Sequence, residues 1–171
     1  TRWTSMSRGL GDVYKRPAVS GRATLAKPVA VGKVVERLVR SLDKVYREKQ
    51  PTVTLELDPS ATFSGDEADL MEVLGNLLEN AYKYCGSMIR VCVQVDEHSN
   101  GIEISIEDDG PGIAPQQVDS VLQRGTRMDE SLPGQGIGLS MASEIITLYG
   151  GQLTFAASPL GGALLRVNFH N

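Results

Sequence analysis

The sequence contains few cysteines, no long apolar run and little excess charge, and each scarcity excludes a class of protein. Its two cysteines, Cys85 and Cys92, are not closely paired, so they do not suggest a zinc site, and one possible bridge would not make a disulfide scaffold. A net charge of -4 is too small to indicate a disordered acidic tail or a nucleic-acid partner. We therefore expect a globular domain in a reducing, cytosolic setting.

No stretch of about eighteen apolar residues occurs, so we expect no membrane span and no membrane contact by this chain. Because the first residue is Thr1 rather than methionine, we interpret the chain as a piece of a longer protein, with any membrane anchor or further domain upstream. Residues 1–27 show no periodicity and are interpreted as a linker, a helix remnant or sequence of artificial origin. Residues 28–171 are long enough for one domain with its own core.

Apolar periodicity predicts three helices and five strands. The helices are expected between Pro28 and Pro51, where the apolar face runs from Val31 to Val45 and Tyr46, and at residues 66–84 and 136–149. The strands are expected at 52–58, 88–95, 101–108, 152–156 and 163–169. A glycine- and proline-rich loop at 109–134, with one helical turn near 116–122, is typical of a functional lid. Because helices and strands do not alternate regularly, we predict an α+β sandwich with helices on one face of a mixed sheet.

The second helix carries a polar row beside its apolar stripe. Glu72, Asn76, Asn80 and Lys83 are spaced by four, four and three residues, so they lie along one side. Asparagine is a poor helix former, which favours a functional reason for the row. Amide oxygens suit Mg²⁺ and a lysine suits a phosphate, although a solvated polar face explains the helix alone equally well.

The segment at 107–112, EDDGPG, follows a strand whose inward face is apolar. The period of two carries Asp108 onto the inward face and turns Asp109 away. A carboxylate on an apolar face needs a partner, and an adenine amino group would be one, with Gly110 and Gly112 letting the backbone approach the base. A plain Asp-Gly turn is the alternative.

The loop GQGIGL, residues 134–139, fits neither common nucleotide motif. No Lys-Ser or Lys-Thr follows its glycines, as a P-loop requires, and its spacing is GxGxG rather than the GxGxxG of a dinucleotide site. What remains is a glycine loop leading into a helix N-terminus that favours an anion, or a structural turn.

Together, NLLENAYKY at 76–84, DDGPG at 108–112 and GQGIG at 134–138 resemble the N, G1 and G2 boxes of sensor histidine kinase ATP-binding domains. The resemblance covers residues 28–169 and is greatest to the PhoQ type, as LDKVYREK, KYC, EDDGPGI and PGQGIGL indicate. It implies a Bergerat-type two-layer fold, with a mostly antiparallel sheet, three helices on one face and a long ATP lid.

The resemblance also implies roles for individual residues in binding ATP and Mg²⁺. Asn80 would coordinate Mg²⁺ with Asn76 beside it, Lys83 would contact phosphate, and Tyr84 would help to enclose the nucleotide. Asp108 would bind the adenine amino group in a pocket shaped by Gly110 and Gly112. Arg127 and Gln135 would reach the phosphates, and the segment containing Gly134, Gly136, Gly138 and Leu139 would cover them; transfer itself would involve Asn76, Lys83 and Arg127. Two positions depart from the pattern, because Leu122 replaces a common lid phenylalanine and Leu132 a second lid arginine, which gives Arg124 or Arg127 more of the phosphate contacts.

The resemblance favours phosphoryl transfer to histidine. The resemblance implies that related hydrolases and serine kinases have a glutamate base one helical turn before the metal-binding asparagine, where this chain has Asn76. A histidine acceptor needs no strong base to attack the phosphoryl group. We expect His98 and His170 to be ordinary surface residues, so the acceptor histidine would lie on a separate dimerisation domain. The full-length protein would be a homodimer in the bacterial inner membrane that passes the phosphoryl group to a response regulator. A serine kinase, an ATPase and an inactive nucleotide-binding regulator remain as alternatives.

Overall fold

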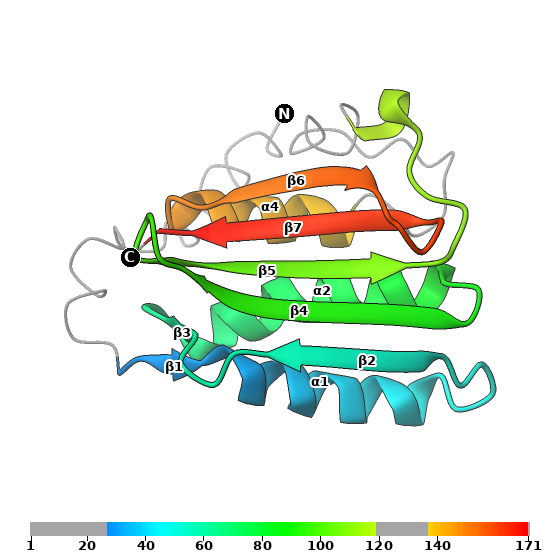
Figure 1. Cartoon of the computed structure of the whole chain (residues 1–171), viewed down its shortest axis with the longest axis horizontal. Helices are drawn as coiled ribbons and strands as arrows, with labels where there is room; N and C mark the ends of the chain where they lie inside the picture. Colours follow the sequence, from blue (N-terminus) through cyan, green and yellow to red (C-terminus); the bar gives the residue numbers. More distant parts are fainter. Residues whose placement is uncertain (1–26, 119–136, 171) are drawn as a thin grey trace, which may run out of the picture.

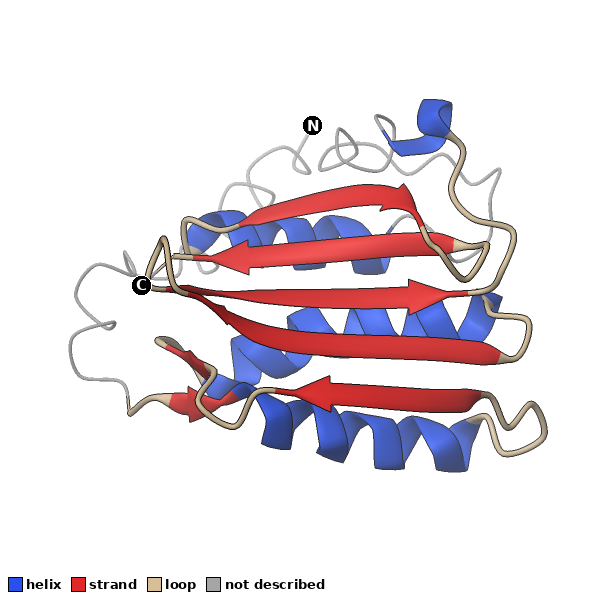
Figure 2. Cartoon of the chain, viewed as in Figure 1, coloured by secondary structure: helices blue, strands red, loops and turns tan. Residues whose placement is uncertain are grey.

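A computed structural model describes residues 27–118 and 137–170, in which three helices lie behind a five-stranded sheet (Figure 1). The strand order is β2-β4-β5-β7-β6, with bounds β2 Thr52–Leu57, β4 Met88–Asp96, β5 Gly101–Asp108, β6 Gln152–Ala157 and β7 Ala163–Phe169. The helices are α1 Val31–Val45, α2 Glu67–Tyr84 and α4 Ile137–Leu148, and all three lie on the same face of the sheet (Figure 2). Only β2 and β4 are parallel among these neighbours, so the predicted mixed, mostly antiparallel sheet is confirmed.

The core lies between the helices and one face of the sheet. Alternation along β5 sends Ile102, Ile104 and Ile106 into this layer, where each side chain is at most 2% exposed. The opposing stripe of α2 is equally buried and consists of Leu70, Val73, Leu74, Leu77, Leu78 and Ala81. Since α2 packs against both α1 and α4, it is the central helix of the layer, and its position relative to β5 sets the geometry of the site.

The ends of the helices follow their local sequence. Asp66 caps α2, because its Oδ1 accepts a hydrogen bond from the Ala68 N–H at 2.8 Å. The helix α4 ends at Leu148, shortly before Gly150, whose φ of +69° is the left-handed conformation that favours glycine, and the Gly151 N–H donates to the Ile146 carbonyl at 2.9 Å. Both ends agree with the sequence prediction.

The first helix and its neighbourhood differ from the prediction. Val45 was expected on the apolar face but its side chain is 73% exposed, because α1 ends there and the chain turns toward β2. A two-stranded sheet formed by β1 Val29–Ala30 and β3 Thr62–Phe63 was not predicted, since strands of two residues carry no periodic signal. The helical turn in the loop lies at 115–118.

Within the two described ranges, no helix combines the length and apolarity needed to cross a membrane. The expectations for residues 1–26 and for the lid segment at 119–136 lie outside the described residues.

Candidate nucleotide-binding site

A pocket lies where β5 and the last turns of α2 end on the same side of the molecule (Figure 1). About 540 Å³ of space lies between its walls, part of which is open to solvent. The lining comes from α2, the end of β5 and the segment after it, α4 and β7, and comprises Asn80, Tyr84, Asp108, Pro111, Gly112, Ile113, Gln117, Leu139, Ala163 and Leu165. A mainly apolar wall with a few polar groups suits a ligand with an apolar body and a few polar atoms.

Asp108 is the carboxylate of this pocket. Its side chain continues the inward face of β5, and the residue is only 4% exposed. Its Oδ1 accepts hydrogen bonds from the N–H groups of Gly110 at 2.8 Å and Ala163 at 3.3 Å. No described residue donates to Oδ2, so one oxygen of a buried carboxylate remains available to a ligand that lines up an N–H donor.

Two glycines make room for this carboxylate and the turn after it. A Cβ at Gly162 would lie 2.2 Å from Oδ1 of Asp108, and a Cβ at Gly110 would lie 2.3 Å from the Tyr84 carbonyl oxygen. The Gly162 N–H also donates to the Asp108 carbonyl at 3.1 Å. Gly112 has a φ of +76°, which directs the chain along the pocket. Backbone contact that only glycine permits therefore holds the segment around Asp108.

Asp109 turns away from the pocket, as the alternation predicted. Its carboxylate accepts hydrogen bonds from the N–H groups of Gly86, Ser87 and Met88 at 2.8 to 3.0 Å, and from the Ser87 hydroxyl at 3.1 Å. Burial alone would raise the pKa of Asp109, but the hydrogen bonds from these backbone N–H groups and from Ser87 outweigh it and lower the pKa to about 2. Asp109 therefore ties the end of β5 to the segment that follows α2.

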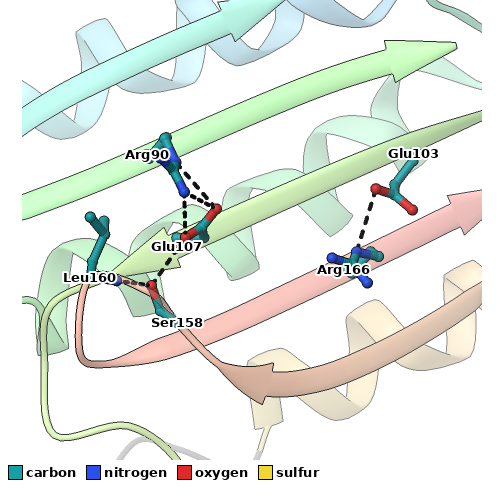
Figure 3. A network of polar contacts seen from close by, with 6 residues as sticks. All are labelled: Arg90, Glu103, Glu107, Ser158, Leu160 and Arg166. Carbon is teal, nitrogen blue, oxygen red and sulfur yellow. Dashed lines mark hydrogen bonds and ion pairs between the residues drawn. The ribbon is translucent and has the colours of Figure 1, made fainter.

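Glu107, one residue earlier, faces the opposite side of the sheet (Figure 3). Arg90 donates to both of its carboxylate oxygens at 2.9 Å, and the Ser158 hydroxyl donates to Oε2 at 3.1 Å. Ser158 also accepts the Leu160 N–H, which fixes the turn between β6 and β7. Because that turn supplies Gly162, this outer network supports the pocket from behind without contributing a group to it.

The predicted polar row on α2 is divided between two environments. Asn80 and Tyr84, one turn apart, line the pocket. Asn76 faces the start of α4 instead, since a Cβ at Gly138 would lie 3.0 Å from its Oδ1. Lys83 is exposed, and its Nζ lies 5.5 Å from the centroid of the Tyr84 ring, a distance at which a cation and an aromatic face attract each other.

Comparison with known proteins identifies the domain. Residues 65–171, more than half of the chain, match the family described as histidine kinase-, DNA gyrase B- and HSP90-like ATPase. The chain belongs to this family. The predicted α+β fold of histidine kinase ATP-binding domains is therefore confirmed.

Individual relatives of this ATPase domain are sensor kinases. The sensor protein PhoQ of Escherichia coli (strain K12) is 37% identical over 166 residues, which are 96% of this chain and 34% of that protein. The two-component sensor PhoQ of Pseudomonas aeruginosa is 38% identical over 164 residues, covering 96% of this chain and 36% of that protein. The solved structure of a mycobacterial sensor histidine kinase, MprB, is 26% identical with a TM-score of 0.70, covering 85% of this chain and 97% of that one. The chain spans about a third of the length of the two PhoQ proteins.

The structure of the ATPase domain brings together part of the predicted site. Asn80, Tyr84, Asp108, Gly112 and Leu139 line one pocket, whereas Asn76, Lys83, Gly110 and Gly138 lie beside it. Arg127, Gly134, Gln135 and Gly136 lie outside the described residues, as do Leu122, Arg124 and Leu132. His98 and His170 are both exposed, as expected.

Several pocket residues escaped the sequence prediction. Ala163 and Leu165 point inward from β7, and they reach the pocket only because β7 pairs with β5. Gly162, which packs against Asp108 beside the pocket, was missed for the same reason, although the Gly161-Gly162 pair marks a turn. Ile113 follows the G1 motif directly and Gln117 lies five positions after Gly112, so proximity to the motif in sequence is the signal that could have found them.

Proposed function

We propose that this ATPase domain is the catalytic, ATP-binding part of a sensor histidine kinase and transfers the γ-phosphoryl group of ATP to a histidine on a separate dimerisation domain. The observation that carries the proposal is that Asp108 and Asn80, from different elements, line the same apolar pocket. The free carboxylate oxygen suits the adenine amino group, and the amide oxygen suits a cation on the phosphates. The sensor kinases among its relatives support the same function.

The residues of the pocket also fit a Mg²⁺ ion that arrives with its nucleotide. Within the described residues, no group of three or more His, Cys, Asp or Glu side chains could hold a metal by itself. Mg²⁺ typically uses one or two protein oxygens together with substrate phosphates and water, so the amide oxygen of Asn80 is a sufficient ligand. Bound there, the ion would neutralise phosphate charge during transfer.

The chain's own residues favour transfer to histidine over hydrolysis. Asn76 has no carboxylate to act as a base, and it lies against Gly138 at the start of α4. A neutral imidazole attacks phosphorus with its own lone pair, so it needs position and charge stabilisation rather than a base. The bond to the β,γ-bridging oxygen breaks, ADP leaves, and a phosphorus–nitrogen bond forms. Lys83, and Arg127 beyond the described residues, would stabilise the negative charge.

The wider protein follows from this role. We infer a membrane-embedded homodimer whose ATPase domain works on the cytoplasmic side and whose phosphohistidine donates to a response regulator. The test is to mix the chain with Mg-ATP and a separate domain carrying the acceptor histidine. Acid-labile, base-stable phosphate on that histidine is expected. Steady ATP hydrolysis by the chain alone, or saturable binding without transfer, would contradict the proposal and favour an ATPase or an inactive regulator.

Asn80→Ala should abolish Mg²⁺-dependent ATP binding, because it removes the only amide oxygen of α2 that lines the described pocket. Asn168→Ala is the matched control, since Asn168 lies on the outer face of β7, paired with Glu103 and Gln152. Titration of both variants with ATP, with and without Mg²⁺, measures the effect. Wild-type affinity in Asn80→Ala would contradict the assignment.

A further inference from the structure

The segment LDKVYREK, residues 42–49, is one of the stretches that indicate the family resemblance, yet it contributes nothing to the pocket lining. The structure brings it to the last turn of α2. The Tyr82 hydroxyl donates to Asp43 Oδ1 at 2.7 Å, and the rings of Tyr46 and Tyr82 have centroids 5.6 Å apart. Lys49 lies after α1, and its Nζ donates to the carbonyl oxygens of Tyr82 and Lys83, both at 2.9 Å.

These contacts supply hydrogen-bond donors to the backbone carbonyl groups at the end of α2. The last four carbonyl groups of a helix lack intrahelical partners. In α2 the Ala81 carbonyl accepts the Cys85 N–H at 2.9 Å, and the Lys49 ammonium serves the next two carbonyls. A positive charge at this end is also favoured by the helix dipole. A residue more than thirty positions away in sequence therefore caps α2.

The capped turn carries two predicted site residues. Tyr84 lines the pocket, and Lys83 lies beside it with its ammonium over the Tyr84 ring. The Tyr84 carbonyl packs on Gly110, whose N–H donates to Asp108. The backbone of this one turn thus connects the group proposed to contact phosphate with the carboxylate proposed to read adenine.

We propose that Lys49 is a positioning residue of the nucleotide site, acting through the last turn of α2 on Lys83 and Tyr84; this role rests on the proposed function. Lys49 makes no contact with the pocket itself, since its ammonium is engaged with helix carbonyls. Its removal takes the ammonium from the Lys83 carbonyl, leaves the Tyr82 carbonyl with only the Cys85 thiol at 3.5 Å, and loosens the turn. Because Lys83 would contact phosphate, the loss falls more on ATP than on adenosine.

The test is the dissociation constant of the whole chain for Mg-ATP and for adenosine in Lys49→Met, which keeps the aliphatic stem and removes the charge. We expect the constant for ATP to rise about five-fold and that for adenosine to change less than about two-fold, consistent with the loss of a charge at a helix C-terminus. Lys49→Arg, which keeps charge and donors, should recover most of the affinity. Tyr82→Phe, which changes no charge, should weaken ATP binding in the same direction.

Lys33→Met is the matched control, because Lys33 is an exposed lysine on α1 and its loss changes the net charge equally. Unchanged ATP affinity in a folded Lys49→Met variant, or an equal loss in Lys33→Met, would overturn the positioning role alone. A wild-type chain that binds no Mg-ATP would overturn the proposed function and this role with it. Melting curves of each variant separate lost affinity from lost folding.

Discussion

Asp108 and Asp109 are consecutive carboxylates at the end of one strand, yet they have opposite environments. Asp108 is 4% exposed, accepts two backbone N–H groups on one oxygen and presents the other to the pocket. Asp109 is surrounded by N–H groups from the segment after α2, and its pKa is about 2. Glu107, just before them, is paired with Arg90 on the far face.

The difference shows that the number of hydrogen-bond donors supplied by the chain itself, rather than burial, decides whether a carboxylate is free to bind a ligand or serves stability. Asp109 has its hydrogen bonds filled by its own chain, so its contribution goes to stability. Asp108 has fewer donors in a more buried site, so a ligand that supplies one gains a charge-assisted hydrogen bond. Three variants test this contrast, beginning with the one expected to change binding most.

Of these three variants, Asp108→Asn should lower the affinity for ATP most. The amide oxygen can keep the hydrogen bonds from Gly110 and Ala163, but an NH2 group then faces the adenine amino group. Loss of a hydrogen bond to a charged acceptor predicts an affinity about 30-fold lower, or about 2 kcal/mol. Competition titrations with ATP and GTP, together with urea unfolding, measure the effect. An equal loss for both nucleotides would contradict adenine recognition by Asp108.

Gly162→Ala should disturb Asp108 without altering its chemistry. The added Cβ would meet Oδ1 of Asp108 at 2.2 Å and the Gly110 nitrogen at 2.5 Å, so the turn must shift. Overpacking of this kind costs about 1–3 kcal/mol of unfolding free energy, and we expect ATP affinity to fall about ten-fold. Gly32→Ala is the control, because Gly32 lies in α1, where alanine favours the helix, and the atom nearest to its added Cβ, the Cβ of Leu57, is 3.5 Å away. Unchanged ATP affinity in Gly162→Ala would show that the turn adapts freely.

Asp109 should affect the pH dependence of the unfolding free energy rather than the affinity for ATP. Its pKa is depressed in the folded chain, so its stabilisation is complete above the unfolded pKa of about 3.9 and is lost as pH falls through about 2. Allowing for solvent, the loss over this window is about 1–2 kcal/mol of unfolding free energy. Urea unfolding between pH 5 and pH 2 measures it, and Asp109→Asn should flatten this part of the profile.

The same experiment sharpens the contrast with Asp108. Asp109→Asn should lower stability at pH 7 and change ATP affinity far less than Asp108→Asn does. If the acid limb of the stability curve is as steep in Asp109→Asn as in the wild-type chain, the clamp on Gly86, Ser87 and Met88 is not the origin of the pH dependence.

Much of the fold was predictable because its signals are local. Alternation along β5 correctly predicted the opposite directions of Asp108 and Asp109, and the four-residue spacing on α2 put Asn80 and Tyr84 on the side that lines the pocket. The prediction that the third helix ends before the Gly150-Gly151 pair was correct for the same reason. The prediction that Val45 lies on the buried apolar face was wrong, because periodicity describes an ideal helix and does not show where packing against the core ends.

The sequence by itself determined the elements, the family resemblance and the chemical character of the site, since periods of 2 and 3.6 and short motifs depend only on neighbours along the chain. Tertiary structure decided which strands meet, and so brought Gly162 and Ala163 from β7 and its turn to Asp108. It also decided that Lys49 caps α2 from another element. Such pairings join residues more than thirty positions apart, and they depend on how whole layers pack rather than on any local pattern.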